Sequence, residues 1–140
     1  MNRGWLRISS VGLIILLLLA SISCGRDQQL VSIQVLPQGA TLGLSGPGEH
    51  LSIQFTAVGS YVHPPESKDI TNTVVWSTDS PQVIDFSTPG SPGLATSTGN
   101  ACGTNIGILA KVYSRPGNPP SGNVVLGTST VNVKIPNCGS

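Results

Sequence analysis

The sequence LSIQFTAVGSY, residues 51–61, carries the clearest structural pattern of the 140-residue chain. Every second position from Leu51 to Tyr61 is apolar or small, and most of the intervening positions are Ser, Gln or Thr. Successive side chains of a β-strand point to opposite faces. The alternation therefore predicts a half-buried strand with one face toward solvent. His63-Pro64-Pro65 should end this strand, because proline cannot donate to the hydrogen-bond ladder.

Shorter stretches of the same kind lie on both sides of this strand. Val31, Ile33 and Val35 alternate with polar residues until Pro37, and the later stretches are separated by Gly and Pro. About seven strands with no helical period predict an all-β domain, a two-sheet antiparallel sandwich. Trp76 is predicted to be buried between the sheets, and a sugar-stacking platform is its alternative role. The predicted strands lie at 31–35, 51–61, 74–76, 83–86, 94–98, 106–112 and 131–135.

Composition limits the class of function. The chain has 7 Lys and Arg against 6 Asp and Glu, a formal net charge of +1, and 9% charged residues. The cations are scattered and form no basic stripe, so the sequence predicts no binding to nucleic acid. The length fits a single domain. The 17 Gly and 11 Pro favour strands and turns over a helical bundle.

The first 23 residues predict a signal peptide. Arg3 and Arg7 precede an apolar run at 11–20, and small residues then lead to Cys24. A run of about ten apolar residues is too short to cross a bilayer, which needs about twenty. The residues before Cys24 resemble the lipobox of bacterial lipoproteins, in which the cysteine thiol receives a diacylglycerol and cleavage makes that cysteine the first residue. The resemblance implies a lipoprotein signal peptide at 1–23 and lipid attachment at Cys24.

Two other targeting outcomes stay open. Ser21-Ile22-Ser23 lacks the leucine usual three residues before a lipidated cysteine, and it also satisfies the small-x-small rule of ordinary secretion. An uncleaved anchor is the third outcome, and all three place the rest of the chain outside the cytoplasm. Residues 24–29 would form a short tether and 30–138 the domain. Sorting rules place Asp after the cysteine for inner-membrane retention, so Gly25 favours the outer membrane if the host has two membranes.

Cys102 and Cys138 remain as a pair once Cys24 carries lipid. Disulfides persist in oxidising compartments, and these two cysteines are placed symmetrically about a turn at Pro119-Pro120 that would join the last two strands. Partners in an antiparallel hairpin lie within the reach of a disulfide. We therefore predict a Cys102–Cys138 bond at the open end of that hairpin. Free thiols are the alternative, and a zinc site is a more remote one because no Cys-x-x-Cys spacing occurs.

The sequence contains no recognisable catalytic, cofactor or metal motif. Gly-x-Ser-x-Gly and Gly-rich phosphate loops are absent. His50 and His63 flank the 51–61 strand, too far apart to share a metal, and are predicted to be exposed loop residues. The acids do not reach the density of a calcium loop, although a weak calcium site between loops is an alternative. Asp69 is predicted to be a turn residue whose carboxylate accepts nearby backbone N–H groups.

Five ordered motifs resemble the bacterial immunoglobulin-like group 2 domain over residues 30–136. The resemblance implies an immunoglobulin-like sandwich of the kind found in bacterial surface proteins, including adhesins, and it implies no activity. The chain departs from the pattern at Cys102, Cys138 and the Pro-rich segment 115–121, so loop contacts of the family are not transferred. The motifs are residues 54–61, Asp69-Ile70-Thr71, Val75-Trp76-Ser77-Thr78, Gly103-Thr104 leading into Ile106, and Val131-Asn132-Val133.

Two classes of function remain at this stage. The first is a non-catalytic cell-envelope lipoprotein, held to the membrane by its lipid, whose domain binds an envelope protein or glycan or serves as a structural or adhesion module. The second is a loop-based metal- or glycan-binding protein or a small extracytoplasmic enzyme. The missing nucleophile, base and ligand clusters favour the first class, with no cofactor. The partner cannot be read from the sequence, because sandwich folds host many functions.

Overall fold

The computed structural model describes residues 28–115, 119–136 and 138. Cys24, the predicted signal peptide and most of the predicted tether lie outside these residues. The described chain contains strands and no helix, which confirms the all-β prediction. The strands are β1 (Gln29–Leu36), β2 (Ala40–Gly43), β3 (Ser52–Gln54), β4 (Thr56–Val62), β5 (Glu66–Asp69), β6 (Val75–Thr78), β7 (Ile84–Asp85), β8 (Leu94–Ser97), β9 (Gly103–Arg115) and β10 (Ser121–Lys134).

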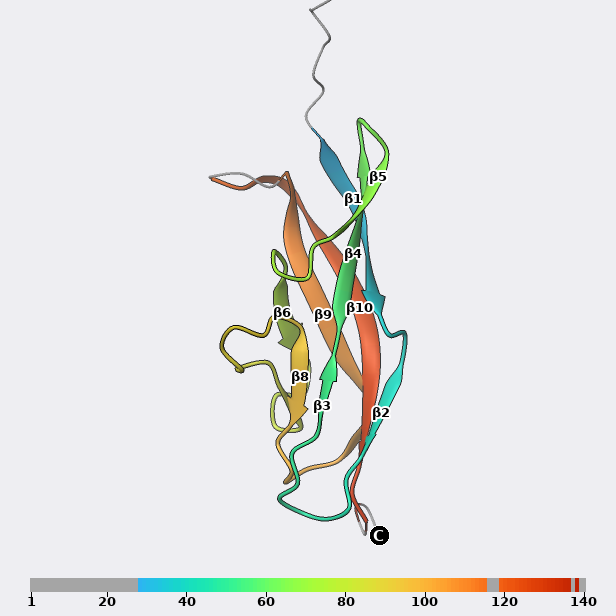
Figure 1. The fold of residues 1–140 in the computed structure, drawn as a ribbon, viewed down its shortest axis with the longest axis vertical. Coiled ribbons are helices and arrows are strands. Elements are labelled where there is room, and N and C mark those ends of the chain that lie inside the picture. The colour runs from blue at the N-terminus through green and yellow to red at the C-terminus, as the bar shows by residue number, and fades with distance from the viewer. Residues whose placement is uncertain (1–27, 116–118, 137, 139–140) are drawn as a thin grey trace, which may run out of the picture.

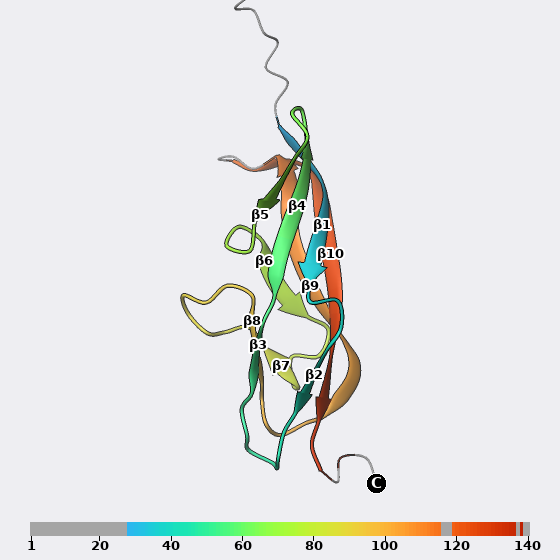
Figure 2. The same cartoon turned by 45° about the vertical axis from the view of Figure 1, so that its right-hand side comes forward.

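The strands form two layers, as predicted for a β-sandwich (Figure 1). The first layer contains two three-stranded sheets, β1-β4-β5 and β3-β8-β7, which are continuous because only Phe55 separates β3 from β4. The second layer is the four-stranded sheet β2-β10-β9-β6. All paired neighbours are antiparallel except β2, which runs parallel to β10. Figure 2 shows β1 and β4 in front of the long β9–β10 hairpin.

The predicted strand at 51–61 has one continuous alternating pattern, but in the structure it forms two strands, β3 and β4, with different partners. β3 pairs with β8, whereas β4 pairs with β1 and β5. At the junction, the Phe55 N–H donates to the Gly93 carbonyl at 2.8 Å, and the Phe55 side chain is completely buried. Gly93 has φ +80°, and a Cβ there would collide with the Phe55 carbonyl oxygen. Glycine is therefore required where the chain changes partners.

A second change of partner separates β1 from β2. β1 belongs to the first layer, and after Pro37-Gln38-Gly39 the chain joins the second layer beside β10. Three hydrogen bonds hold the crossing to β10. The Gln38 side-chain amide donates to the Thr128 carbonyl at 3.2 Å. The Ser129 hydroxyl donates to the Pro37 carbonyl at 2.5 Å and accepts the Gly39 N–H at 3.3 Å. These changes of partner, together with the unpredicted strands β2 and β5, explain why ten segments replace the seven expected.

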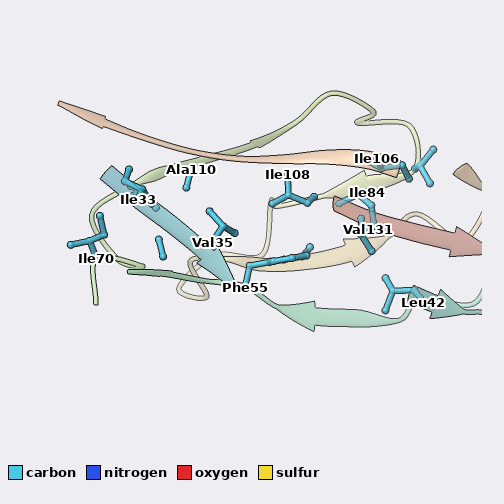
Figure 3. Close-up of a cluster of buried hydrophobic side chains, with 14 of the residues drawn as sticks. Ile33, Val35, Leu42, Phe55, Ile70, Ile84, Ile106, Ile108, Ala110 and Val131 are labelled. Carbon is cyan, nitrogen blue, oxygen red and sulfur yellow. The ribbon is translucent and has the colours of Figure 1, made fainter. Parts of the chain in front are cut away.

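The core lies between the two layers and follows the predicted alternation. Leu30 and Val31 are the exception, because a bulge between Leu30 and Ser32 shifts the register. Leu30 is consequently buried, and Val31, predicted to face the core, is 51% exposed. Figure 3 shows the buried side chains meeting from strands far apart in the sequence. They include Ile33, Val35, Phe55, Ala57, Ile106, Ile108, Ala110, Val131 and Val133.

Trp76 faces the core but is only partly buried, which corrects the prediction of full burial between the sheets. Its ring stacks on Phe86 with centroids 5.8 Å apart, and its indole N–H donates to the Thr71 carbonyl at 3.0 Å. β6 is one of the two edge strands of the four-stranded sheet. No further strand of this sheet lies beyond β6 in the described chain, so the tryptophan is covered less completely than side chains on the central strands.

The Cys102–Cys138 disulfide is present, with the two α-carbons 6.2 Å apart. The two cysteines are not strictly opposite each other in the hairpin. The β9–β10 register pairs Gly103 with Val133, so Cys102 does not face Cys138 directly across the ladder. Instead the chain turns after β10, with the Cys138 N–H donating to the Ile135 carbonyl at 3.1 Å. The bond closes the open end of the hairpin. Residues 117 and 118 of the predicted turn, together with residue 116, lie outside the described chain.

Candidate functional site

The outer surface of the second layer carries an unusual group of exposed apolar side chains. Val75, Tyr113, Val124 and Leu126 surround Lys111, and we call these five residues the apolar face. Lys111 pairs with Val75 on one side and Leu126 on the other, and Tyr113 pairs with Val124. Their exposed fractions are 61% for Val75, 45% for Tyr113, 49% for Val124 and 54% for Leu126.

The local sequence explains why these side chains point outward. On β9, Ile106, Ile108 and Ala110 point into the core, so the alternate positions Lys111 and Tyr113 face solvent. On β10, the run Val124-Val125-Leu126 places Val125 inward and its two neighbours outward. Outward positions of a half-buried sheet are usually polar. A cluster of apolar side chains there is the signature of an interaction surface rather than of a core.

Four of the five residues of the apolar face, all except Leu126, line a groove. A cavity of about 460 Å³ is lined by residues of β6, β9 and β10 together with Thr73 and Pro120. A smaller pocket of about 260 Å³ shares Thr73, Val112 and Tyr113 with it and extends toward Gln28 and Tyr61. The groove offers hydrocarbon, one phenol and one ammonium group. This chemistry suits an apolar or amphipathic partner.

A polar network borders the smaller pocket and fixes the start of β1. The Gln28 side-chain amide donates to Glu66 at 3.0 Å, and Lys68 donates to the Gln28 side-chain oxygen at 3.0 Å. Lys68 also pairs with Glu66 at 3.0 Å and lies 5.5 Å from the centre of the Tyr61 ring. The hydrogen bonds from Lys68 and Gln28 hold the pKa of Glu66 below its usual value. The network ties the last residues of the predicted tether to the β4–β5 hairpin.

Asp69 is the turn residue that the sequence predicted. Its carboxylate accepts the Thr71 N–H at 2.8 Å. Hydrogen bonding to the Thr71 side chain, and then to the Thr71 backbone N–H, lowers the pKa of Asp69. Thr71 in turn accepts the Ala57 N–H through its hydroxyl oxygen at 3.0 Å and the Trp76 indole N–H through its carbonyl. The role of Asp69 is to shape the connection between β5 and β6, so we assign it no ligand.

The two histidines are exposed and lie at opposite ends of the β3–β4 segment, as predicted. His63 follows β4, and His50 precedes β3, where its Nδ1 donates to the Ser97 carbonyl at 2.8 Å. Within the described part of the chain, no group of three or more His, Cys, Asp or Glu side chains could hold a metal ion. The same residues contain no helix long and apolar enough to span a membrane.

Of the three cysteines predicted as site residues, the structure describes two. Cys102 and Cys138 are joined, whereas Cys24 lies outside the described residues. The apolar face was not predicted. Its only signal in the sequence is the unbroken apolar run 124–126, which interrupts the alternation of its strand, and nothing in the sequence places Val75 beside it.

Comparison with known proteins gives no further constraint. No protein-family model matches the chain, and no curated protein matches it.

Proposed function

We propose that the chain is a non-catalytic lipoprotein of the bacterial cell envelope, anchored through Cys24, whose immunoglobulin-like domain acts as an extracytoplasmic binding or structural module. The observation that carries the proposal is the Cys102–Cys138 disulfide. The chain has three cysteines, and this bond uses two of them. The third, Cys24, follows an apolar run and small residues, as an acylated cysteine does.

The disulfide also supports an extracytoplasmic location. Disulfides form and persist outside the reducing cytosol. The bond closes the open end of a hairpin, and the described chain has no group of three or more His, Cys, Asp or Glu side chains that could hold a metal ion. Neither cysteine has a second Cys at Cys-x-x-Cys spacing, so the bond lacks this feature of a redox centre. Its role in the proposal is to stabilise a small exported domain.

The order of strands supports the immunoglobulin-like assignment. In that fold, strands A, B, E and D form one sheet and C, F and G the other. The same order is found here when the strands are lettered along the chain. The first layer has β1, β3–β4, β8 and β7 in the places of A, B, E and D, and the second layer has β6, β9 and β10 in the places of C, F and G. Trp76 on β6 then occupies the strand that carries a core tryptophan in immunoglobulin domains. β2 and β5 are additions to this plan.

Membrane fractionation of three proteins tests the anchor. The wild-type protein should partition with membranes, and the Cys24→Ala variant should not, because it lacks the acylated thiol. A double Cys102→Ala, Cys138→Ala variant is the matched control: it removes two thiols, weakens the fold and should stay with membranes. Membrane association of a processed Cys24→Ala variant would contradict the proposal.

A second measurement separates a binding module from an enzyme or metal protein. The membrane-purified protein is assayed for bound metal and screened against hydrolase substrates. We expect neither stoichiometric metal nor turnover. Stoichiometric metal would favour the loop-based metal-binding alternative, and turnover that survives purification would favour an enzyme.

A further inference from the structure

Most of the exposed large hydrophobic side chains lie in one half of the molecule. The described chain has six large hydrophobic side chains that are exposed, and five of them, Val31, Val75, Tyr113, Val124 and Leu126, lie in the half where β1 begins. Val31, Val124 and Leu126 line a further groove of about 420 Å³ between β1 and β10. The apolar face therefore continues around the hairpin toward β1. Figure 1 shows that β1 begins at this end, while β10 ends at the opposite end.

The predicted tether is short, so the end of the domain where β1 begins would stay close to a membrane that holds Cys24. In a mature chain that begins at Cys24, as proposed above, five residues from Cys24 to Gln28 precede β1. A fully extended chain spans at most about 3.6 Å per residue, so the start of β1 lies within about 18 Å of the Cys24 α-carbon. Gln28 is itself held by Glu66 and Lys68, which shortens the free part of the tether further. An acyl chain on Cys24 would place this end of the domain beside the lipid headgroups.

We propose that the apolar face, together with Val31, rests on the lipid surface and fixes the orientation of the anchored domain. This inference rests on the proposed acylation of Cys24. Transfer of valine and leucine side chains from water to the interfacial region of a bilayer lowers the free energy. Tyrosine suits the same region because its ring is apolar and its hydroxyl polar, and a lysine can bury its aliphatic stem while its ammonium stays near headgroups.

The charges near this face suit a lipid surface. Lys111 lies in the centre of the apolar face, and Arg115 follows two positions after Tyr113 on the same side of β9. Neither cation takes part in an ion pair among the described residues, where Lys68 and Glu66 form the only one. Exposed cations beside apolar side chains favour a surface that carries anionic headgroups.

The tether also favours lipid over a second copy or another protein as the occupant. Once the acyl chain on Cys24 is inserted into the bilayer, the domain is tethered to the lipid surface. The effective concentration of lipid at the apolar face is then high without any additional affinity. A protein partner would have to displace that contact. The consequence is that the disulfide end, with the loops near His50 and Asn100, points away from the membrane and is the end available to envelope partners.

Nuclear magnetic resonance of the acylated full-length protein in lipid nanodiscs tests the orientation. The discs contain phosphatidylethanolamine and phosphatidylglycerol, with a spin label on a small share of headgroups, and the readout is the attenuation of each backbone amide signal. We expect the amides of Tyr113, Val124 and Leu126 to be attenuated at least about twofold more than those of Thr41 and Val133 at the other end of the same sheet.

Two variants separate the apolar face from the tether alone. Val124→Ser with Leu126→Ser removes exposed hydrocarbon and should reduce attenuation at Tyr113 by about half. Thr128→Ser with Thr130→Ser changes outward residues of the same strand, further from the tether, and should leave the attenuation unchanged. Equal attenuation of the two ends in an acylated, disc-bound protein would overturn this inference and leave the anchor intact. A dimer of disc-bound protein that buries Tyr113 in the interface between its two copies would also overturn this inference and leave the anchor intact. A protein that lacks the acyl group and does not enter discs would overturn the inference and the proposed function together.

Discussion

Phe55 joins the two halves of the first layer. Its backbone N–H bonds to Gly93, its side chain is fully buried, and its ring lies 6.5 Å from that of Trp76. The alternation at 51–61 predicted that Phe55 faces the core. It could not predict the change of partner, because a period of two tells which face a residue takes and not which strand lies beside it.

Truncation of Phe55 should be among the most damaging single changes in the domain. Phe55→Ala should lower the free energy of unfolding by about 3–5 kcal/mol, since it removes a large buried ring and leaves a cavity. Phe86→Ala removes a ring that is only partly buried and serves as the control, with a smaller loss. Urea unfolding of the Cys24→Ala protein, followed by circular dichroism, measures both. A loss below about 1 kcal/mol for Phe55→Ala would show that this junction is not part of the cooperative core.

Asp69 should make part of the stability dependent on pH. Hydrogen bonds from Thr71 lower the pKa of Asp69 below its ordinary value of 3.8. A lowered pKa means that the carboxylate stabilises the fold above the ordinary value and that this contribution is lost as the pH falls through the folded pKa. Asp69→Ala should therefore be less stable than the parent at neutral pH, with a difference that shrinks on acidification.

Asp69→Asn is the matched control, because an amide oxygen can still accept the Thr71 N–H without carrying charge. It should retain more stability than Asp69→Ala at neutral pH. Urea midpoints of both variants and the parent, measured from neutral pH to below 3.8, decide the point. A constant difference between Asp69→Ala and the parent across that range would refute the role of the ionised carboxylate.

Among the strands, those with long alternation could be predicted and those without it could not. The segment at 106–112 lies within β9, and residues 131–134 of the segment at 131–135 lie within β10. Most of their inward residues are buried, whereas Val112 and Ile135 are only partly buried. β5 was missed because all four of its residues are exposed, so backbone pairing with β4 holds it and no apolar pattern marks it. β2 was missed because it is short and joins β10 only after the crossing at Pro37.

The approach of β10 to β1 depends on a residue without a side chain. A Cβ on Gly127 would lie 2.6 Å from Cγ2 of Ile33 and 2.9 Å from its carbonyl oxygen. Gly127→Ala should thus force the layers apart and lower the free energy of unfolding by about 1–3 kcal/mol. Gly43→Ala on β2 is the control, since a Cβ there meets nothing within 4 Å. Thermal unfolding compares them, and equal melting temperatures for the two variants would contradict the close packing.

For the molecule as a whole, the disulfide and the apolar face mark opposite ends. The sequence predicted the disulfide because cysteine parity and spacing are visible along the chain. It did not predict the apolar face, because that surface forms only when β6 and β10 lie on either side of β9, which brings Val75 near residues about fifty positions later. Surfaces built from distant segments require the pairing of strands to be known.

Reduction should destabilise the domain markedly. The bond joins residues separated by 36 positions, and a loop of that size contributes about 3–4 kcal/mol by restricting the unfolded chain. The melting temperature should then fall by more than about 10 °C on reduction. The Cys102→Ala, Cys138→Ala variant should melt at the temperature of the reduced protein and respond no further to reductant. An unchanged melting temperature of the fully reduced parent would show that the hairpin end is held by packing alone.

The most direct test of the proposed anchor is the intact mass of the mature protein extracted from host membranes. We expect a chain that begins at Cys24, carries a diacylglycerol on that cysteine, and lacks the two hydrogens that the Cys102–Cys138 bond removes. A membrane-derived chain that begins at Cys24 without lipid, or that retains residues 1–23, would contradict the account.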